Sequence, residues 1–317
     1  MRVIIDAFGG DNAPLCVLKG CALALSERNS VNITCVGNEE IIKKVAIDNN
    51  ISLDGIDIVN APDVISFNDP PMDIMKKHSD CSMAVGLKLL SLGKGDVFIS
   101  AGSTGALVVG GSLIVKRLPG IKRPAIAALF PSKTGKFMLI DSGANYDCRP
   151  LMLQQFAVIG SELMQKIYKV TKPRVGILNI GEEAIKGTDL QRETFKLLSE
   201  SLDVNFVGNI EPQAAFAGKC DVLVSDGFSG NILLKSTEAT SKFLFLQIKD
   251  VFYSNIFTKF AAAILKSKFL KLKSKLDPSN FGGAPLIGLL KPVIKVHGNA
   301  NEFAIKNAVL QAVERVR

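Results

Sequence analysis

Short apolar runs alternate with longer amphipathic stretches along most of this chain, and that alternation restricts the fold more than any other feature. The runs are rich in Val and Ile, which is typical of buried strands. They predict strands at 3–6, 33–36, 56–59, 97–100, 125–129, 137–140, 175–179, 204–207, 222–225 and 293–296. The stretches between them predict helices at 15–26, 39–48, 81–92, 151–167, 190–198 and 301–316. This order indicates a mostly parallel sheet with helices on both faces.

Length and composition narrow the class of protein. A chain of 317 residues with 47% hydrophobic content is long enough for one large α/β domain or two small ones, and it is too apolar for wholesale disorder. Its N-terminus, Met-Arg-Val-Ile-Ile-Asp, reads as a strand, and no apolar run reaches the ~18 residues of a membrane span. We therefore expect a cytosolic protein without a membrane-spanning helix.

The charged residues favour acidic partners. Lys and Arg number 38 against 30 Asp and Glu, giving a formal charge of +8. Phosphate, anionic lipid or an acidic protein would suit this excess, although a solubility bias spread over the surface explains it equally well.

Four predicted strands end in polar, glycine-rich loops: 6–12, 100–105, 179–182 and 225–231. In open α/β sheets, ligands bind outside the carboxyl ends of the strands. Turn and cap chemistry would explain one such loop, but four of them favour a binding site. We therefore expect the four loops to face one shared crevice, onto which Thr104, Lys186 and Asn231 open.

Several familiar motifs are missing. The first strand is not followed by Gly-x-Gly-x-x-Gly, and the chain has neither a Walker loop nor a Gly-x-Ser-x-Gly elbow. The six cysteines form no Cys-x-x-Cys pair, and only His78 and His297 are present as histidines. We therefore expect no nucleotide or other cofactor, no metal and no acyl-enzyme nucleophile.

The remaining groups suit chemistry in which phosphate is itself a substrate. The run 100–106 predicts a small anion site made of backbone N–H groups and hydroxyls. Lys186 precedes a flexible glycine, and Asn231 follows one. His297 lies just past the last strand, where a pocket role and a structural role are equally compatible with the sequence. If phosphate attacks a thioester, the main demand is a donor for the oxyanion, worth ~2.7–4 kcal/mol.

One segment differs from the rest. From 242 to 276 the chain predicts two helices with a corner at 253–255, and no Asp or Glu occurs from 251 to 276. In the second helix an apolar stripe that includes Phe257, Phe260, Ile264 and Leu265 is flanked by lysines. This pattern favours contact with anionic lipid or an acidic partner, and a dimer-packing helix with a basic face is the alternative.

The ordered set of loops resembles the bacterial phosphate acyltransferase (PlsX) family over nearly the whole chain. Each motif is weak alone, and their order gives the resemblance its strength. The matching segments are 6–11, 100–106, 123–127, 141–145, 179–187, 206–211, 226–231, 282–286 and 297–298. The chain departs from the family pattern at Phe8, at Ser103, at Phe281 and at Asn299–Ala300.

The resemblance implies a fold and an activity. The fold is a three-layer α/β/α sandwich related to phosphotransacetylases and isocitrate dehydrogenases. We expect a single catalytic domain over 1–317, with the helical hairpin at 242–276 inside it. The activity is transfer of a fatty acyl group from acyl carrier protein to inorganic phosphate, for phospholipid synthesis.

The resemblance also implies partners and site residues. The partners are a second copy of the chain, the membrane surface, to which the protein binds peripherally, and a downstream glycerol-3-phosphate acyltransferase; no nucleic acid is expected. Lys186 and Asn231 are the expected catalytic groups. Asp6 would help to shape the crevice, and Phe257, Phe260, Ile264 and Leu265 would contact the membrane. The expected phosphate- and substrate-binding residues are Asp11, Ser100, Gly102, Ser103, Thr104, Asn145, Asn209, Asp226 and His297.

Two other functions remain open at this point. A short-chain phosphotransacylase acting on acyl-coenzyme A would use the same groups, although the amphipathic hairpin argues against it. A membrane-surface scaffold without turnover would have no use for Lys186 and Asn231.

Overall fold

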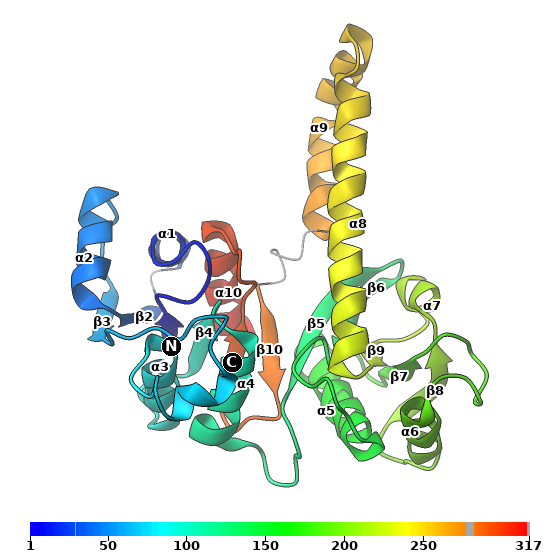
Figure 1. Ribbon diagram of the computed structural model, residues 1–317. Helices are drawn as coiled ribbons and strands as arrows, with labels where there is room; N and C mark the ends of the chain where they lie inside the picture. Colours follow the sequence, from blue (N-terminus) through cyan, green and yellow to red (C-terminus); the bar gives the residue numbers. More distant parts are fainter. Residues whose placement is uncertain (29, 277–281, 316–317) are drawn as a thin grey trace.

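The computed structural model describes residues 1–28, 30–276 and 282–315, and its strands form an 11-stranded sheet (Figure 1). In spatial order the strands run β3-β2-β1-β4-β11-β10-β5-β6-β9-β7-β8. Their bounds are β1 Arg2–Asp6, β2 Asn32–Gly37, β3 Ile56–Asn60, β4 Val97–Ser100, β5 Ala125–Ser132, β6 Gly135–Ile140, β7 Arg174–Leu178, β8 Asn205–Ile210, β9 Val222–Val224, β10 Ala284–Ile287 and β11 Val293–Lys295.

Helices cover both faces of the sheet, so the expected three-layer α/β/α fold is confirmed. Their bounds are α1 Leu15–Glu27, α2 Glu39–Asp48, α3 Ser82–Ser91, α4 Thr104–Gly110, α5 Pro150–Tyr168, α6 Asp189–Ser199, α7 Pro212–Phe216, α8 Gly227–Tyr253, α9 Ile256–Leu276 and α10 Glu302–Arg315. In the half of the sheet that contains β1 to β4, α1 and α10 cover one face, and α3 and α4 cover the other. In the half that contains β6 to β9, α5 and α6 cover one face, and α7 and the base of α8 cover the other.

The strand direction reverses near the middle of the sheet. Strands β1 to β4 and β11 are parallel, as are β6 to β9. Between these two sets, β10 is antiparallel to both of its neighbours, and β5 is antiparallel to β6. The two parallel sets therefore run in opposite directions. Along the direction of the strands, the carboxyl ends of one set lie at the end of the sheet where the other set has its amino ends.

The apolar periodicity placed the regular elements well. The six predicted helices agree with the structure within one residue at each described end, and the ten predicted strands agree within three. The prediction missed β10, because its Ala-Pro-Leu-Ile sequence is short, contains a proline and follows two glycines. Such a run reads as a turn rather than as a strand.

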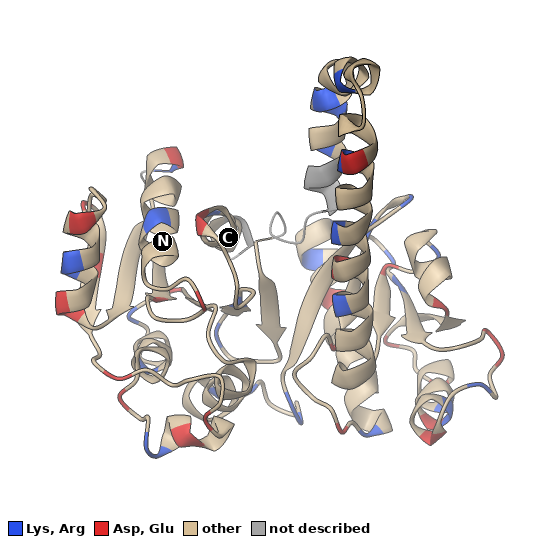
Figure 2. Cartoon of the chain, turned by 45° about the horizontal axis from the view of Figure 1, so that its top comes forward, with Lys and Arg blue, Asp and Glu red and all other residues tan. Residues whose placement is uncertain are grey.

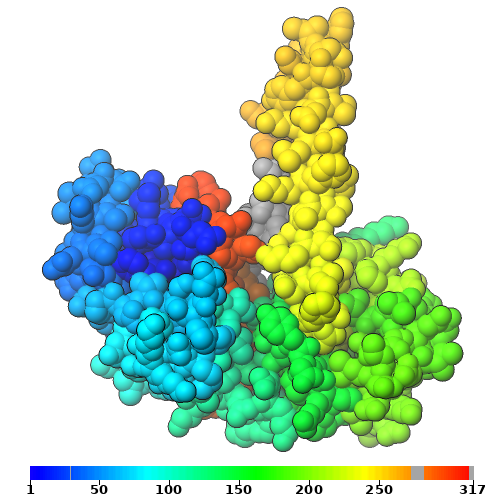
Figure 3. Space-filling view, viewed as in Figure 1, coloured from blue at the N-terminus to red at the C-terminus, as the bar shows by residue number. Residues whose placement is uncertain are grey.

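Helices α8 and α9 form a hairpin that projects away from the sheet (Figures 1 and 3). The chain turns at Ser254–Asn255, where the side chain of Asn255 accepts a hydrogen bond from Thr258 N at 3.0 Å. Phe269 of α9 packs edge-on against Phe245 and Phe252 of α8, with ring centroids 5.7 and 5.5 Å apart. These contacts hold the two helices side by side.

Helix α8 begins 15 residues earlier than the predicted start at Lys242. The sequence 227–230, Gly-Phe-Ser-Gly, was interpreted as loop, because glycines normally weaken a helix. Here they permit close contact between backbones: a Cβ at Gly230 would lie 1.9 Å from the carbonyl oxygen of Asp141, and one at Gly227 would lie 2.6 Å from that of Asn145. The first turn of α8 therefore packs directly on the loop that follows β6.

This contact predicts the effect of Gly230→Ala. The added methyl group would displace the Asp141 carbonyl, so we expect a loss of about 1–3 kcal/mol in the free energy of unfolding, although glycine to alanine normally stabilises a helix. Urea unfolding followed by circular dichroism measures this change. Ser236→Ala, at an exposed position of the same helix, is the matched control, and equal stabilities of the two variants would contradict the prediction.

Candidate active site

The buried carboxyl group of Asp6 organises the carboxyl ends of β1 and β4. Its two oxygens accept hydrogen bonds from Ser82 Oγ at 2.6 Å and from Ser100 Oγ at 2.7 Å. Ser100 Oγ in turn accepts a hydrogen bond from Gly102 N at 3.0 Å. Burial raises the pKa of Asp6, and the hydrogen bonds from the two serines oppose that shift only in part.

This network changes the role expected for two residues. The hydroxyl of Ser100 and the N–H of Gly102 were predicted to bind phosphate, but both already bond to protein groups. Ser103 likewise accepts a hydrogen bond from Ala106 N at 3.5 Å and caps α4. These residues therefore shape the turn between β4 and α4. Thr104, at the start of α4, is half-buried, and no side-chain hydrogen bond is recorded for it among the described residues.

A cavity of about 250 Å³ lies beside this turn. Asp6, Asp11, Ser82 and Gly102 contribute to its wall, together with Phe8 and the segment 64–67. It combines carboxylates and hydroxyls with an apolar side, as is typical of small-molecule sites. Gly9 is essential to the close packing here, because a Cβ at that position would lie 2.6 Å from Asp6 Oδ2 and 2.7 Å from Gly102 N.

Two lysines and His297 lie at the end of β11. Lys295 Nζ donates hydrogen bonds to Ala101 O at 3.1 Å and to Val296 O at 2.5 Å. Lys235 Nζ, from α8, lies 2.5 Å from His297 Nε2, and Glu238 Oε2 lies 3.7 Å from both groups. Lys235 and Lys295 were missed from the sequence, although a lysine at the end of an apolar strand is an available signal.

In the other half of the sheet, the carboxyl group of Asp141 fixes the loop after β6. It accepts hydrogen bonds from Asn145 N at 2.7 Å and from Ile126 N at 2.9 Å, among others. Asn145 Nδ2 donates to Pro124 O and to Asp141 Oδ2, both at 2.8 Å. Asn145 was expected to bind substrate; both hydrogens of its amide are donated to protein acceptors, and its Oδ1 is buried without a hydrogen-bond partner among the described residues.

Asp226 and Asn231 lie at the start of α8, directly after β9. Asp226 Oδ1 accepts a hydrogen bond from Ser229 N at 2.8 Å and caps the helix. Asn231 is half-buried against the loop 141–145, since a Cβ at Gly143 would lie 3.4 Å from Asn231 Cγ. Among the described residues, the structure records no hydrogen bond for the Asn231 amide, which leaves its N–H groups available to a ligand.

Lys186 is exposed in the loop that follows β7. Two buried asparagines hold this loop: Asn179 Nδ2 donates to Lys186 O at 3.1 Å, and Asn209 Nδ2 donates to Glu183 O at 2.8 Å. Asn209 was expected to bind substrate, and the structure gives it this positioning role. Its Oδ1 is buried and has no partner in the part of the chain that the structure describes.

The predicted site residues therefore form two groups. Asp11, Thr104 and His297 belong to the first half of the sheet, and Lys186 and Asn231 belong to the second. The loops of the two groups do not lie along one row of parallel strand ends, because the two parallel sets run in opposite directions. That the four loops face one shared crevice stays a prediction.

Two contacts join the groups across the middle of the molecule. Ala144 packs against the apolar cluster that contains Ala106 and Leu107 of α4. Lys235, one helical turn beyond Asn231 on the same face of α8, reaches His297. The start of α8 and the end of β11 therefore meet at the junction of the two halves.

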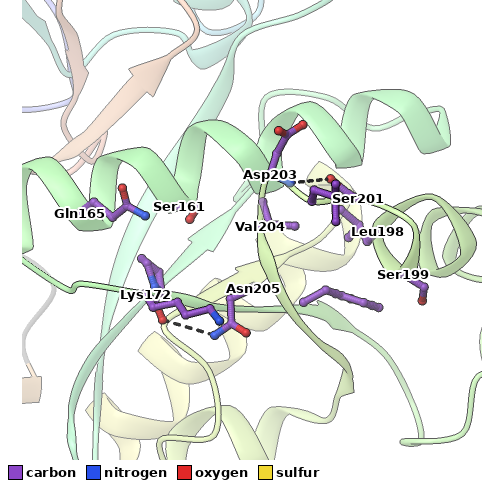
Figure 4. A pocket seen from close by; sticks show the side chains of 12 residues that line it. Ser161, Gln165, Lys172, Leu198, Ser199, Ser201, Asp203, Val204 and Asn205 are labelled. Atoms are coloured by element: carbon purple, nitrogen blue, oxygen red, sulfur yellow. Dashed lines mark hydrogen bonds between the residues drawn. The ribbon is translucent and has the colours of Figure 1, made fainter.

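A larger cavity of about 600 Å³ lies elsewhere, between α5, α6 and the start of β8 (Figure 4). Its wall includes Lys172, Val204 and Asn205, at the amino ends of β7 and β8. None of the predicted site residues lines it, so it does not belong to the candidate site.

The cysteines are poorly suited to act as nucleophiles. Five of the six are buried, and burial raises the pKa values of Cys148 and Cys220 to about 12. The thiolate is the reactive form of cysteine, and so little of it is present near neutral pH.

Comparison with known proteins adds independent information. The family model described as "Fatty acid synthesis protein" matches residues 1–317. A phosphate acyltransferase of Halothermothrix orenii is 42% identical over 317 residues, which are 100% of this chain and 95% of that protein. A phosphate acyltransferase of Bacillus pumilus is 43% identical over 313 residues, covering 98% of this chain and 93% of that protein.

Solved structures share the fold at low sequence identity. A phosphotransacetylase from Streptococcus pyogenes superimposes with a TM-score of 0.66 at 18% identity, covering 100% of this chain and 94% of that one. A branched-chain phosphotransacylase from Enterococcus faecalis gives a TM-score of 0.62 at 15% identity, covering 100% of this chain and 99% of that one.

Proposed function

Because the chain belongs to the fatty acid synthesis protein family and is an acyltransferase of the phosphate acyltransferase type, we propose that it transfers a fatty acyl group from acyl carrier protein to inorganic phosphate. The product would be an acyl phosphate, which a glycerol-3-phosphate acyltransferase would use in phospholipid synthesis. One observation carries the proposal. The Lys186 ammonium and the Asn231 amide are two available donors that follow the adjacent strands β7 and β9.

The reaction needs little from the protein beyond positioning and charge stabilisation. A phosphate oxygen attacks the thioester carbonyl carbon, the C–S bond breaks, and the carrier leaves as a thiolate that takes up a proton from water. The negative charge that develops on the carbonyl oxygen would be stabilised by Asn231 and Lys186. Because phosphate is already anionic near neutral pH, no side chain has to activate it, and the buried cysteines take no part.

The first group of residues would hold the acceptor. Thr104 offers a half-buried hydroxyl at the start of α4, and Asp11 lines the neighbouring cavity. The contacts described above give Ser100, Gly102 and Ser103 the supporting task of holding this turn in place. Asn145, Asn209 and Asp226 would support the second group in the same way.

We expect Lys186→Ala and Asn231→Ala each to lower kcat/KM by about 10²–10³, the usual effect of removing one oxyanion donor. The assay measures thiol release from acyl carrier protein loaded with a long acyl chain. Lys196→Ala, which removes an exposed lysine of α6, should keep wild-type activity.

Two outcomes of this assay would count against the proposal. Thiol release by the wild-type protein in the absence of phosphate would indicate a thioesterase. Faster reaction with acetyl-coenzyme A than with the long-chain carrier substrate would indicate a short-chain phosphotransacylase.

We also propose that the tip of the hairpin contacts an anionic membrane surface. No helix in the described ranges is long and apolar enough to cross a membrane. On α9, however, Phe257, Phe260 and Ile264 are 84%, 72% and 68% exposed. Leu265 is partly exposed beside them, and lysines recur along the same helix (Figure 2). Exposed apolar groups flanked by cations suit the headgroup boundary of anionic lipid.

This surface predicts that Phe260→Glu combined with Ile264→Glu releases the protein from vesicles containing anionic lipid. The measurement is co-sedimentation with phosphatidylglycerol vesicles. Ser236→Glu combined with Thr240→Glu adds the same charge at exposed positions near the base of α8 and should leave binding intact. Equal binding by the wild-type protein and the tip variant would remove the membrane proposal.

Exposed apolar residues along α8 suggest a different partner, a second copy of the chain. Phe243, Leu246 and Val251 are each more than half exposed although α8 packs against α9, and exposed apolar residues gathered on one helix are typical of protein interfaces. Sedimentation velocity should therefore give twice the monomer mass of 34.0 kDa. Phe243→Glu combined with Leu246→Glu should yield the monomer, and a monomeric wild-type protein would refute this interface.

A further inference from the structure

Two lysines from different parts of the chain reach the carboxyl end of β11, at the junction of the two halves. Lys295 extends from the end of β11 toward the turn before α4, where its Nζ meets the carbonyl of Ala101. Lys235 reaches the same strand end from α8 and touches His297. The recorded partners of Lys295 Nζ are the backbone carbonyls of Ala101 and Val296, and the described part of the chain provides no carboxylate within 4.0 Å of it.

The surroundings of Lys295 are short of negative charge. Asp6 and Asp11 favour its charged form from a distance, and Asp6 is itself buried in hydrogen bonds with two serines. Burial and the positive charge of Lys235 outweigh them and lower the pKa of Lys295 to about 8. The carboxylate oxygen Glu238 Oε2 lies 3.7 Å from Lys235 Nζ and 3.7 Å from His297 Nε2. Two cations that repel each other in this way are stabilised by an anion placed between them.

We propose that Lys235 and Lys295, together with His297, form the binding site for a phosphate group. A tetrahedral anion would accept hydrogen bonds from the remaining ammonium protons of both lysines. Naming this anion as the acceptor phosphate rests on the proposed function, whereas the binding site itself does not.

The position of the site fits that use. Lys235 and Asn231 are four residues apart, so they share one face of α8 and lie about one helical turn, ~5.4 Å, from each other along the axis. Lys295 lies beside the turn that leads to Thr104, through its bond to Ala101. A phosphate held by the two lysines would therefore lie beside the turn that leads to Thr104 and about one helical turn from Asn231, the residue proposed to polarise the acyl carbonyl.

Direct binding tests the proposal without any acyl donor, so failure of the proposed function would not affect the result. The probe is sulfate, a dianion of the same shape whose charge is constant over the neutral and mildly alkaline range, and calorimetry gives its affinity. Lys235→Met and Lys295→Met should each weaken sulfate binding about tenfold or more. Lys291→Met, at the opposite end of β11, is the control and should change it less than about twofold.

The pH dependence gives a second, independent readout. Sulfate binds the protonated form of Lys295, so its affinity for the wild-type protein should fall as the pH rises through about 8. In Lys295→Met that fall should disappear. Thermal unfolding of each variant shows that it is folded, and Lys235, whose side chain is 52% exposed, provides a variant that does not disturb the core.

Two further ligands identify the source of the phosphate group. Tighter binding of inorganic phosphate than of 4′-phosphopantetheine would assign the site to the acceptor, and the reverse order would assign it to the arm of the acyl donor. Wild-type sulfate affinity in both methionine variants, or a wild-type affinity that is independent of pH, would overturn the proposal.

Discussion

The contact between the first turn of α8 and the loop after β6 is the constraint on which the rest of the structure depends. The carboxyl group of Asp141 accepts hydrogen bonds from the backbone N–H groups of Gly143, Ala144 and Asn145 in that loop and so gives it one shape. Gly227 and Gly230 then let the helix backbone approach that loop more closely than any side chain would allow. Because α8 is continuous for 27 residues, fixing its first turn fixes its whole direction. The position of Asn231, the reach of Lys235 and the projection of the hairpin all follow from it.

This arrangement gives one helix three tasks. Its second turn carries Asn231, its third turn brings Lys235 to the other half of the sheet, and its far end supports α9. A rigid element that spans the junction holds the two groups of polar residues in register although they belong to strands of opposite direction. It also links the candidate active site physically to the surface proposed for membrane contact. The link is the continuous backbone of α8, from Gly227 to Tyr253.

The sequence predicted the regular elements better than their arrangement. Apolar periodicity located the strands and helices, because each one buries an apolar face and this demand is local. The direction of β6 relative to β1 could not be predicted in this way, since it depends on a short β10 that reads as a turn. The same limit explains why Ser100, Asn145 and Asn209 were predicted to bind ligand. Small polar residues at strand ends look alike in sequence whether they face a ligand or hold a loop, and only their hydrogen-bond partners distinguish the two roles.

Lys295 shows what a charge pattern can add once the structure is known. In the sequence it is one of many cations in a basic chain. Its charge state and position depend on neighbours that are far away in sequence: Asp6 on β1, Ala101 after β4 and Lys235 on α8. Burial alone would make this lysine a cost to stability, because the charged form loses its hydration. Placed beside a second cation, it is more unfavourable still in the unliganded protein. An anion that binds there offsets this cost, so the two lysines that lower stability where the two halves meet are also the ones that favour a phosphate group at that place.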